Sequence, residues 1–320
     1  MTARSQTSSA YTLLEMLLVL ALLGIVVVGS FNLSEINVRS IQFDLNDVRL
    51  TAVREAILGS PEAQLEEHLF ISGFAADLGR LPNTISELLR PESLPLWAYD
   101  EATDQWSGWR GPYLHTFALQ EGLSAYPDSW GNLGDTDSFG WNLSVDQTEG
   151  TLFLQSYGAD GVPGGTGYDS DYPQSALLIQ RGEALVDIVG WQVTVHFYNP
   201  EGGPTGGIAL PSADTRVRVR LHYPDSGNMS WPPTWPATEG ERDQANYLSE
   251  DITLAAGAVA DNAVSSMVMS FGSETKRAPF GIRSVSVVDD TDGTRIGDSA
   301  QPAWRVELVS QLQPRPTAIA

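Results

Sequence analysis

The chain has 320 residues, of which 42% are hydrophobic, so it carries enough apolar material for one large domain or two ordinary ones. Forty acidic residues against eighteen basic ones give a formal net charge of -22, and a surface this negative repels the phosphates of nucleic acid. The chain has no cysteine, which excludes disulfides, zinc–thiolate sites and thiolate nucleophiles.

The N-terminus divides into a short polar leader and a long apolar run. Residues 1–10 read MTARSQTSSA, and the run from Tyr11 to Phe31 is almost wholly apolar. A helix over this run would rise ~31 Å, close to the hydrocarbon thickness of a bilayer. An ordinary secretory signal is cut after its apolar segment, whereas here the small residue Ala10 precedes it, so we expect the helix to survive processing.

Glu15 lies inside the apolar run. A carboxylate in such surroundings costs several kcal/mol unless it is paired or protonated. Cleavage after Ala10 would free the α-amino group of Tyr11, which supplies a positive charge on a neighbouring copy. Glu15 is therefore predicted to set the register between subunits. The alternative is a plain single-pass anchor in which Glu15 faces water.

The order of residue types here is a small residue, an aromatic residue, Thr-Leu-Leu-Glu and an apolar helix, and it resembles the prepilin cleavage and methylation signal of type IV pilins and type II secretion pseudopilins. The resemblance covers residues 5–32 and implies a prepilin peptidase that cuts between Ala10 and Tyr11 and methylates Tyr11. The family usually has Gly before the cut, and its major subunits often have a helix-breaking Pro where this chain has Asn32; the second departure favours a minor subunit.

The same resemblance implies a cellular location and partners. The chain would insert in the bacterial inner membrane by its single N-terminal helix. An inner-membrane assembly platform would then extract it, and it would polymerise with other pseudopilins or pilins into a periplasmic or cell-surface filament. No nucleic acid is expected among its partners.

Apolar residues at helical spacing continue the first helix beyond Phe31, and Gly59, Ser60 and Pro61 are predicted to end it. A second amphipathic helix follows, broken at Gly79. Between 105 and 145, Trp, Gly, Asp and Pro punctuate short strands joined by tight turns.

Two strings in this stretch, GWRGPYL at 108–114 and DSWGN at 128–132, are similar to head motifs of the major type II secretion pseudopilin, where they recur around a small antiparallel sheet. Read from the residues alone, Trp109 and Trp130 are more simply core residues than ligand contacts.

Residues 152–173, LFLQSYGADGVPGGTGYDSDYP, place Asp160, Asp169 and Asp171 among several glycines. Carboxylates so concentrated repel one another, and a hard cation relieves that repulsion. Glycine allows the backbone to turn with positive φ and to aim carbonyl oxygens inward. The spacing does not match an EF-hand. A calcium loop and a metal-free acidic turn both remain open.

The same string strongly resembles the calcium loop that closes the head of the major type II secretion pseudopilin. The resemblance implies Ca²⁺ as the bound ion, with Asp160 and Asp169 as side-chain ligands and Asp171 as a weaker candidate. It also implies backbone ligands from the carbonyls of Ser156 and Gly158.

The last part of the chain alternates apolar and polar residues over 191–197 and 216–223, and four further short strands are predicted. Gly/Pro-rich turns between them favour a β-sandwich. The WPPTWP string could display Trp231 and Trp235 for stacking on sugars or on a partner, or the two could cap the sandwich. The arginines at 216, 218 and 220 could face an acidic neighbour or simply solvent.

The predicted fold class is α+β: a long N-terminal α-helix as membrane or filament stalk, packed on a small antiparallel-sheet pilin head and followed by an all-β sandwich-like domain. The predicted domains are a leader, a hydrophobic then amphipathic helix, a pseudopilin-like head with the calcium loop, and a C-terminal β module, over 1–10, 11–58, 59–173 and 174–320.

No nucleophile-elbow or phosphate-loop motif occurs, so no enzymatic activity is expected. The predicted function is a structural subunit of a type II secretion-like pseudopilus that supports protein export across the outer membrane. The alternative is a minor type IV pilin or surface adhesin whose C-terminal module binds carbohydrate or a protein.

Overall fold

The fold was analysed in a computed structural model of the chain. Within the first helix, side chains are described at 14–27 and 37–58. The structure describes residues 13–59, 64–65, 68–69, 72–103, 105–115, 117–118, 124–134, 137–174, 177–198, 213–227, 234–257, 264–272, 276–296 and 304–305.

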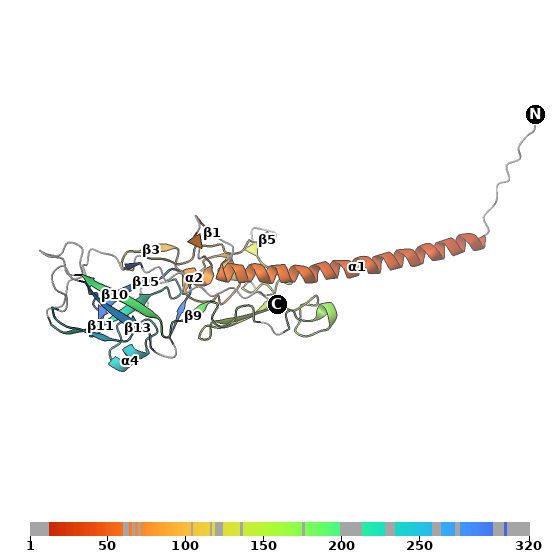
Figure 1. The fold of residues 1–320 in the computed structure, drawn as a ribbon. Helices are drawn as coiled ribbons and strands as arrows, with labels where there is room; N and C mark the ends of the chain where they lie inside the picture. Colours follow the sequence, from red (N-terminus) through yellow and green to blue (C-terminus); the bar gives the residue numbers. More distant parts are fainter. Residues whose placement is uncertain are drawn as a thin grey trace, which may run out of the picture.

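Helix α1 (Leu13–Leu58) runs from the N-terminal end of the described chain into the head. Figure 1 shows its first part projecting beyond the rest of the molecule and its last part lying against the head. Leu50, Val53 and Ile57 of the last part are almost fully buried. Gly59 ends the helix at φ 81°, and a Cβ there would lie 1.9 Å from the carbonyl oxygen of Ser72, so only glycine fits.

The described residues include no helix that is both long enough and apolar enough to cross a membrane. The expectation of a long apolar helix serving as a membrane stalk is therefore wrong for the described chain.

The head core forms where the end of α1 meets two short helices, α2 (Phe74–Leu78) and α3 (Ser86–Leu89). Gly79 caps α2 in the left-handed conformation at φ 76°. The buried apolar side chains of these three helices belong to one cluster with the inward residues of a later hairpin, Leu152 and Leu154.

Among the described residues, the strands of the head pair as separate two-stranded antiparallel ribbons, so the expected single antiparallel sheet is wrong for this part of the chain. Turn-forming Gly, Pro and Asp interrupt this part of the chain every few residues, so most of its strands are short. The pairs are β1 (Gln64–Leu65) with β2 (His68–Leu69), β3 (Ala98–Asp100) with β4 (Gln105–Ser107), β5 (Phe117–Ala118) with β6 (Ser124–Ala125), and β7 (Trp141–Asp146) with β8 (Thr151–Ser156).

The C-terminal part is mostly β. A four-stranded antiparallel sheet has the order β12 (Ile252–Leu254), β11 (Thr215–His222), β15 (Ser284–Asp289), β16 (Trp304–Arg305). Two further ribbons pair β10 (Gln192–Tyr198) with β13 (Val264–Ser270) and β9 (Leu185–Asp187) with β14 (Arg277–Pro279).

Alternate residues of β10 and β11 are buried in one apolar cluster, as their period of two requires. Helix α4 (Glu239–Gln244) and the one-turn helix η2 (Gly167–Asp169) of the glycine-rich loop complete the described elements. The predicted fold class, with its long apolar helix as a membrane stalk on a single-sheet head, is therefore wrong. The described chain is a mixed α and β structure whose C-terminal part is mostly β.

The C-terminal part is fastened to the head through the segment that follows β11. The Gly227 amide donates to the Leu78 carbonyl at 2.9 Å, and the Ser107 hydroxyl donates to the Gly227 carbonyl at 3.0 Å. A Cβ on Gly79 would lie 1.6 Å from the carbonyl oxygen of Pro224. The two parts therefore meet in close backbone contact.

Candidate functional site

Three regions of the molecule contain the candidate functional residues: the projecting part of α1, the glycine-rich loop with its surroundings, and a cleft between the head and the C-terminal part. The predicted processing residues Ala10 and Tyr11 lie outside the described residues. Glu15 is described and exposed on α1.

The projecting part of α1 exposes nearly all of its apolar side chains. Leu14 is 76% exposed and Ile25 is 69% exposed, so neither side chain is packed in a core. The other large exposed apolar residues of this stretch are Met16, Leu17, Leu18, Val19, Leu20, Leu22, Leu23, Val26 and Val27. So much apolar surface in one place marks an interaction site.

A buried aspartate connects the DSWGN turn to the start of the glycine-rich loop. Asp128 is fully buried and accepts hydrogen bonds from the Asn132 amide at 3.0 Å and from its side-chain Nδ2 at 2.8 Å. Its other contact is the Ser156 hydroxyl, which donates at 2.6 Å. Neutral donors thus satisfy this carboxylate, and the bonds fix two chain segments to each other.

Helix α1 joins the same network. Asn46, fully buried on α1, accepts from the Ser129 amide at 2.9 Å and donates to the Ser156 hydroxyl at 3.4 Å. Arg49, one turn further on, donates to the carbonyls of Pro127 and Asp128 at 2.5 Å each. We call this set of contacts around Asp128 the helix latch, because it holds α1 to the turn and to the loop.

The carbonyls of Ser156 and Gly158, the two predicted backbone ligands of the loop, both accept hydrogen bonds from other residues of the chain. The Ser156 carbonyl accepts from the Tyr172 amide at 2.9 Å, and the Gly158 carbonyl accepts from Asn132 Nδ2 at 2.9 Å. Both residues are buried, at the base of the loop. Ser156 belongs to the helix latch through its hydroxyl and closes the loop through its bond with Tyr172, and Gly158 joins the loop to Asn132.

The three predicted carboxylate ligands are not brought together. Asp160 accepts from the Val162 amide of its own turn at 3.1 Å, and Asp171 accepts from the Gly164 amide across the loop at 3.0 Å. Asp169 lies in the one-turn helix η2. Across the described residues, no group of three or more Asp, Glu, His or Cys side chains is placed to hold a metal ion. The loop nevertheless concentrates oxygen donors of the kind that Ca²⁺ takes.

Of the two tryptophans predicted for ligand stacking, Trp235 is described by the structure. Trp231 lies outside the described residues. Trp235 is half-buried, and its indole nitrogen donates to the Asp290 carbonyl at 3.0 Å. A Cβ on Gly293 would lie 2.4 Å from the Trp235 ring, so this ring packs on a backbone turn. Trp235 caps the C-terminal part.

Sequence reasoning missed an ionic centre beneath Trp235. The strand alternation placed Arg218 on an open face, yet its side chain is fully buried and bonded to Asp290, which also accepts from Arg242 Nε at 2.9 Å. Arg218 further donates to Asp243 at 2.8 Å. The acidic pair at 289–290 was the available signal, because a buried guanidinium needs a carboxylate partner.

A further buried acid lies under the GWRGPYL motif. Asp77 of α2 is 4% exposed and receives Arg110 at 3.1 Å and the Tyr113 hydroxyl at 3.0 Å. Burial raises the pKa of Asp77 to about 6, against the opposing pull of the Arg110 charge. Trp109 of the same motif is buried as predicted, and its indole donates to the Glu87 carbonyl at 2.7 Å.

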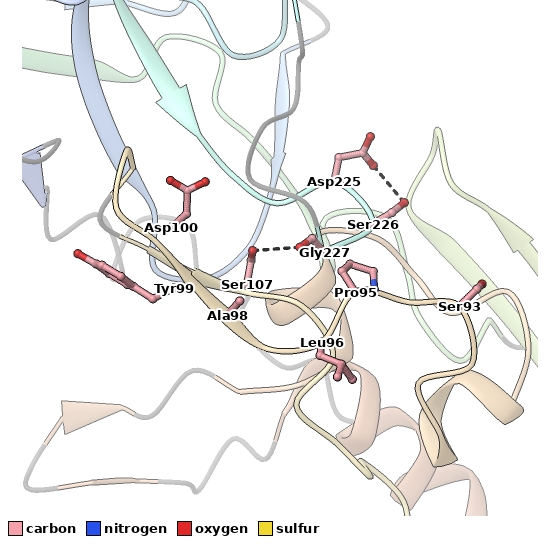
Figure 2. Close-up of a pocket in the computed structure, with 10 residues that line it drawn as sticks. All are labelled: Ser93, Pro95, Leu96, Ala98, Tyr99, Asp100, Ser107, Asp225, Ser226 and Gly227. Atoms are coloured by element: carbon pink, nitrogen blue, oxygen red, sulfur yellow. Dashed lines mark hydrogen bonds between the residues drawn. The ribbon is translucent and has the colours of Figure 1, made fainter.

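A cleft of about 640 Å³ opens where the β3–β4 hairpin meets the segment after β11 (Figure 2). Its walls carry hydroxyls, two carboxylates and apolar groups, but no basic side chain. The lining residues are Ser93, Pro95, Leu96, Ala98, Tyr99, Asp100, Ser107, Asp225, Ser226 and Gly227.

Comparisons of the chain with protein-family models, with curated proteins and with solved structures found no match.

Proposed function

We propose that the chain is a structural subunit of a pilin-type filament, a type II secretion-like pseudopilus that supports protein export across the outer membrane. The observation that carries the proposal is the contrast within α1. Residues 14–27 expose their apolar side chains, while Leu50, Val53 and Ile57 of the same helix are buried in the head. Neighbouring subunits that pack through the exposed stretch would remove this surface from water.

A subunit that transmits force along a filament needs its helix firmly joined to its head, and the contacts of α1 support this role. The helix latch joins Asn46 and Arg49 to the DSWGN turn. Nearer the end of the helix, Arg54 makes a bidentate ion pair with Glu183 at 2.5 and 2.8 Å. Because both partners are buried, this pair fixes the rotation of the helix on the head.

The remaining parts of the proposal come from the N-terminal signal. A prepilin peptidase would cut between Ala10 and Tyr11, and Glu15 would meet the freed amine of an adjoining copy. The proposal sets the chain in a bacterial cell envelope, with other pseudopilins and an assembly platform as partners. The predicted inner-membrane stage before assembly concerns residues 11–31, of which 11 and 12 lie outside the described residues and 13 and 28–31 are described in their backbone alone.

Assembly of a Glu15→Gln variant tests the proposal. We expect the neutral side chain to lower filament yield at least about fivefold, because a charge pair in apolar surroundings is worth more than about 1 kcal/mol. The measurement is the amount of chain in sheared, pelleted filaments when the full-length protein is produced with a secretion assembly system. Glu55→Gln is the matched control, since Glu55 is also an exposed glutamate on α1.

Two results would contradict the proposal. One is filament yield from Glu15→Gln equal to that from Glu55→Gln. The other is a mass spectrum in which the chain from producing cells keeps all of residues 1–10.

Calcium binding by the glycine-rich loop is a further part of the proposal, supported by its concentration of oxygen donors. Because the carboxylates are separated, Ca²⁺ would have to draw Asp160, Asp169 and Asp171 together and so tie the loop more tightly. We expect Ca²⁺ to raise the melting temperature of the full-length protein in detergent, by several degrees over a chelator-treated sample, since a ligand that binds only the folded state stabilises it.

Asp160→Ala should abolish the rise in melting temperature, and Asp187→Ala, an exposed aspartate outside the loop, should keep it. Equal melting temperatures of wild type in Ca²⁺ and in chelator would exclude the calcium loop and leave the filament proposal intact.

A further inference from the structure

The part of α1 that carries the helix latch also presents a row of exposed apolar side chains. The four residues of this row are between 43% and 63% exposed: Val38, Ile41, Leu45 and Val48. Their spacing of three, four and three positions places them along one face of the helix. We call this row the α1 seam. Large apolar side chains gathered in one row at the surface mark a place where another molecule packs.

The α1 seam and the contacts with the glycine-rich loop lie on opposite sides of the helix. Phe43 packs on Tyr172 of the loop, with ring centroids 4.6 Å apart. At about 100° per residue, Phe43 lies about 160° around the helix axis from Leu45. The loop therefore binds one side of the helix and leaves the other side, with the seam, open to a partner.

The spacing of the seam is that of the a and d positions of a coiled coil. In the heptads that it defines, Asp44 stands at a g position and Arg49 at the next e position. Two parallel helices in register place each g residue opposite the e residue of the following heptad, so Asp44 would face Arg49 of the second copy. An antiparallel pair places g opposite g and e opposite e, which sets like charges together. The charges therefore favour parallel helices.

The seam is continuous with the apolar stretch of α1 at 14–27. Leu17, Leu20 and Val27 stand at the same heptad positions, 21 residues before Val38, Ile41 and Val48, and all three are exposed. A parallel pair of helices would cover both stretches in one contact. An antiparallel pair joined over the seam would leave each 14–27 stretch projecting into water.

We propose that the α1 seam binds the α1 seam of a second copy of this chain, parallel and in register. Each copy carries a net charge of -22 and repels the other at long range, so the association depends on apolar contact at short range. An in-register pair sets each residue opposite itself and is symmetric. Successive subunits of a filament are displaced along its axis and cannot make this contact. The inference therefore goes beyond the proposed filament and holds whether or not filaments form.

Cysteine cross-linking of the full-length protein in detergent tests the inference, because the chain has no cysteine of its own. Leu45→Cys should give a disulfide-linked dimer on mild oxidation, since an in-register pair brings the two introduced thiols together. Ser40→Cys is the matched control: Ser40 is also exposed on α1 but lies about 140° around the helix from Leu45. We expect at least about fivefold more cross-linked chain from Leu45→Cys than from Ser40→Cys.

A mixture of two single-cysteine proteins tests the direction of the helices. Val38→Cys and an affinity-tagged Val48→Cys carry their thiols about 15 Å apart along the helix. In a parallel pair each should cross-link with its own kind. An antiparallel pair would bring the two positions together and give a mixed disulfide, which is recognised by its mass.

Sedimentation in density-matched detergent measures the association without a cross-link. Ile41→Gln should weaken it about tenfold, because an amide replaces an apolar side chain in the contact. Ser40→Gln places the same amide outside the seam and should leave the association unchanged. Asp44→Arg sets like charges opposite each other and should weaken it about three- to tenfold, whereas Asp187→Arg makes the same charge change outside α1 and should not.

Three results would overturn the inference: equal cross-linking of Leu45→Cys and Ser40→Cys, a mixed disulfide between the two proteins of the mixture, or unchanged association of Ile41→Gln. The last would assign the association to the 14–27 stretch alone. All the substituted side chains are exposed, so the variants should melt as the wild type does, and a loss of association then comes from the seam. None of these results changes the outcome expected for Glu15→Gln in filaments.

Discussion

Two buried aspartates, one in the head and one in the C-terminal part, are stabilised in opposite ways. Asp128 in the head receives amide and hydroxyl groups, all neutral, from Asn132 and Ser156. Asp290 in the C-terminal part receives the guanidinium groups of Arg218 and Arg242. The first arrangement joins separate segments of chain by hydrogen bonds, and the second balances charges inside one module.

The difference predicts different consequences of removing each acid. Without Asp290, two guanidinium groups are left with too little counter-charge, and the cost falls on global stability. Without Asp128, no charge is stranded, but Asn132 and Ser156 lose their common acceptor. The head should therefore loosen locally, and the C-terminal part should unfold as a unit.

The largest expected effect is that of Asp290→Ala. We expect the free energy of unfolding of the C-terminal part to fall by about 3–5 kcal/mol, because Arg218 is fully buried and loses its closest partner. Chemical denaturation followed by near-UV circular dichroism measures the change. Asp243→Ala is the control: this acid contacts the same arginine but is 56% exposed, so its loss should cost less than about 1 kcal/mol. Equal losses in the two variants would show that burial does not decide the outcome.

Asp128→Ala comes next, with an expected loss of about 2–3 kcal/mol from unsatisfied donors on Asn132 and Ser156. The sharper readout is hydrogen exchange, which should accelerate in the glycine-rich loop and along α1 near Asn46. Asp146→Ala removes an exposed acid that accepts only from the turn amides at 148 and 149, and it should leave both regions protected. Unchanged exchange near Asn46 in Asp128→Ala would mean that the latch does not hold the helix.

The sequence predicted features that depend on local order and missed those that depend on distant contacts. The alternation of Val217, Val219 and Leu221 correctly placed an apolar face, because the period of two is set within the strand. The burial of Trp109 also followed from residue type. By contrast, Arg218 was read as facing outward because the chain that covers it, around Ser249, lies about thirty residues away.

The same limit explains the candidate site. The acids of the glycine-rich loop were identified by their closeness in sequence, yet Asp160 bonds an amide of its own turn and Asp171 bonds the Gly164 amide across the loop. Asp128 contacts this loop through Ser156, 28 positions later, and no local pattern encodes that contact. The long apolar helix was inferred from the composition of the N-terminal run. Composition alone does not show which part of a helix packs on the head.

The smallest expected effect is a pH dependence that arises at a third buried acid, Asp77. Its pKa of about 6 in the folded chain exceeds the ordinary 3.8, so its contribution to stability is full below pH 3.8 and is lost as the pH rises through 6. Lowering the pH from 7 to 5 should therefore stabilise the wild type by about 1 kcal/mol relative to Asp77→Asn, which cannot titrate. Thermal unfolding of both proteins across this range measures the difference and cancels the other acids. The reverse sign, with wild type losing stability on acidification, would mean that the ion pair with Arg110 outweighs burial, and Asp77 would then resemble Asp290 more than Asp128.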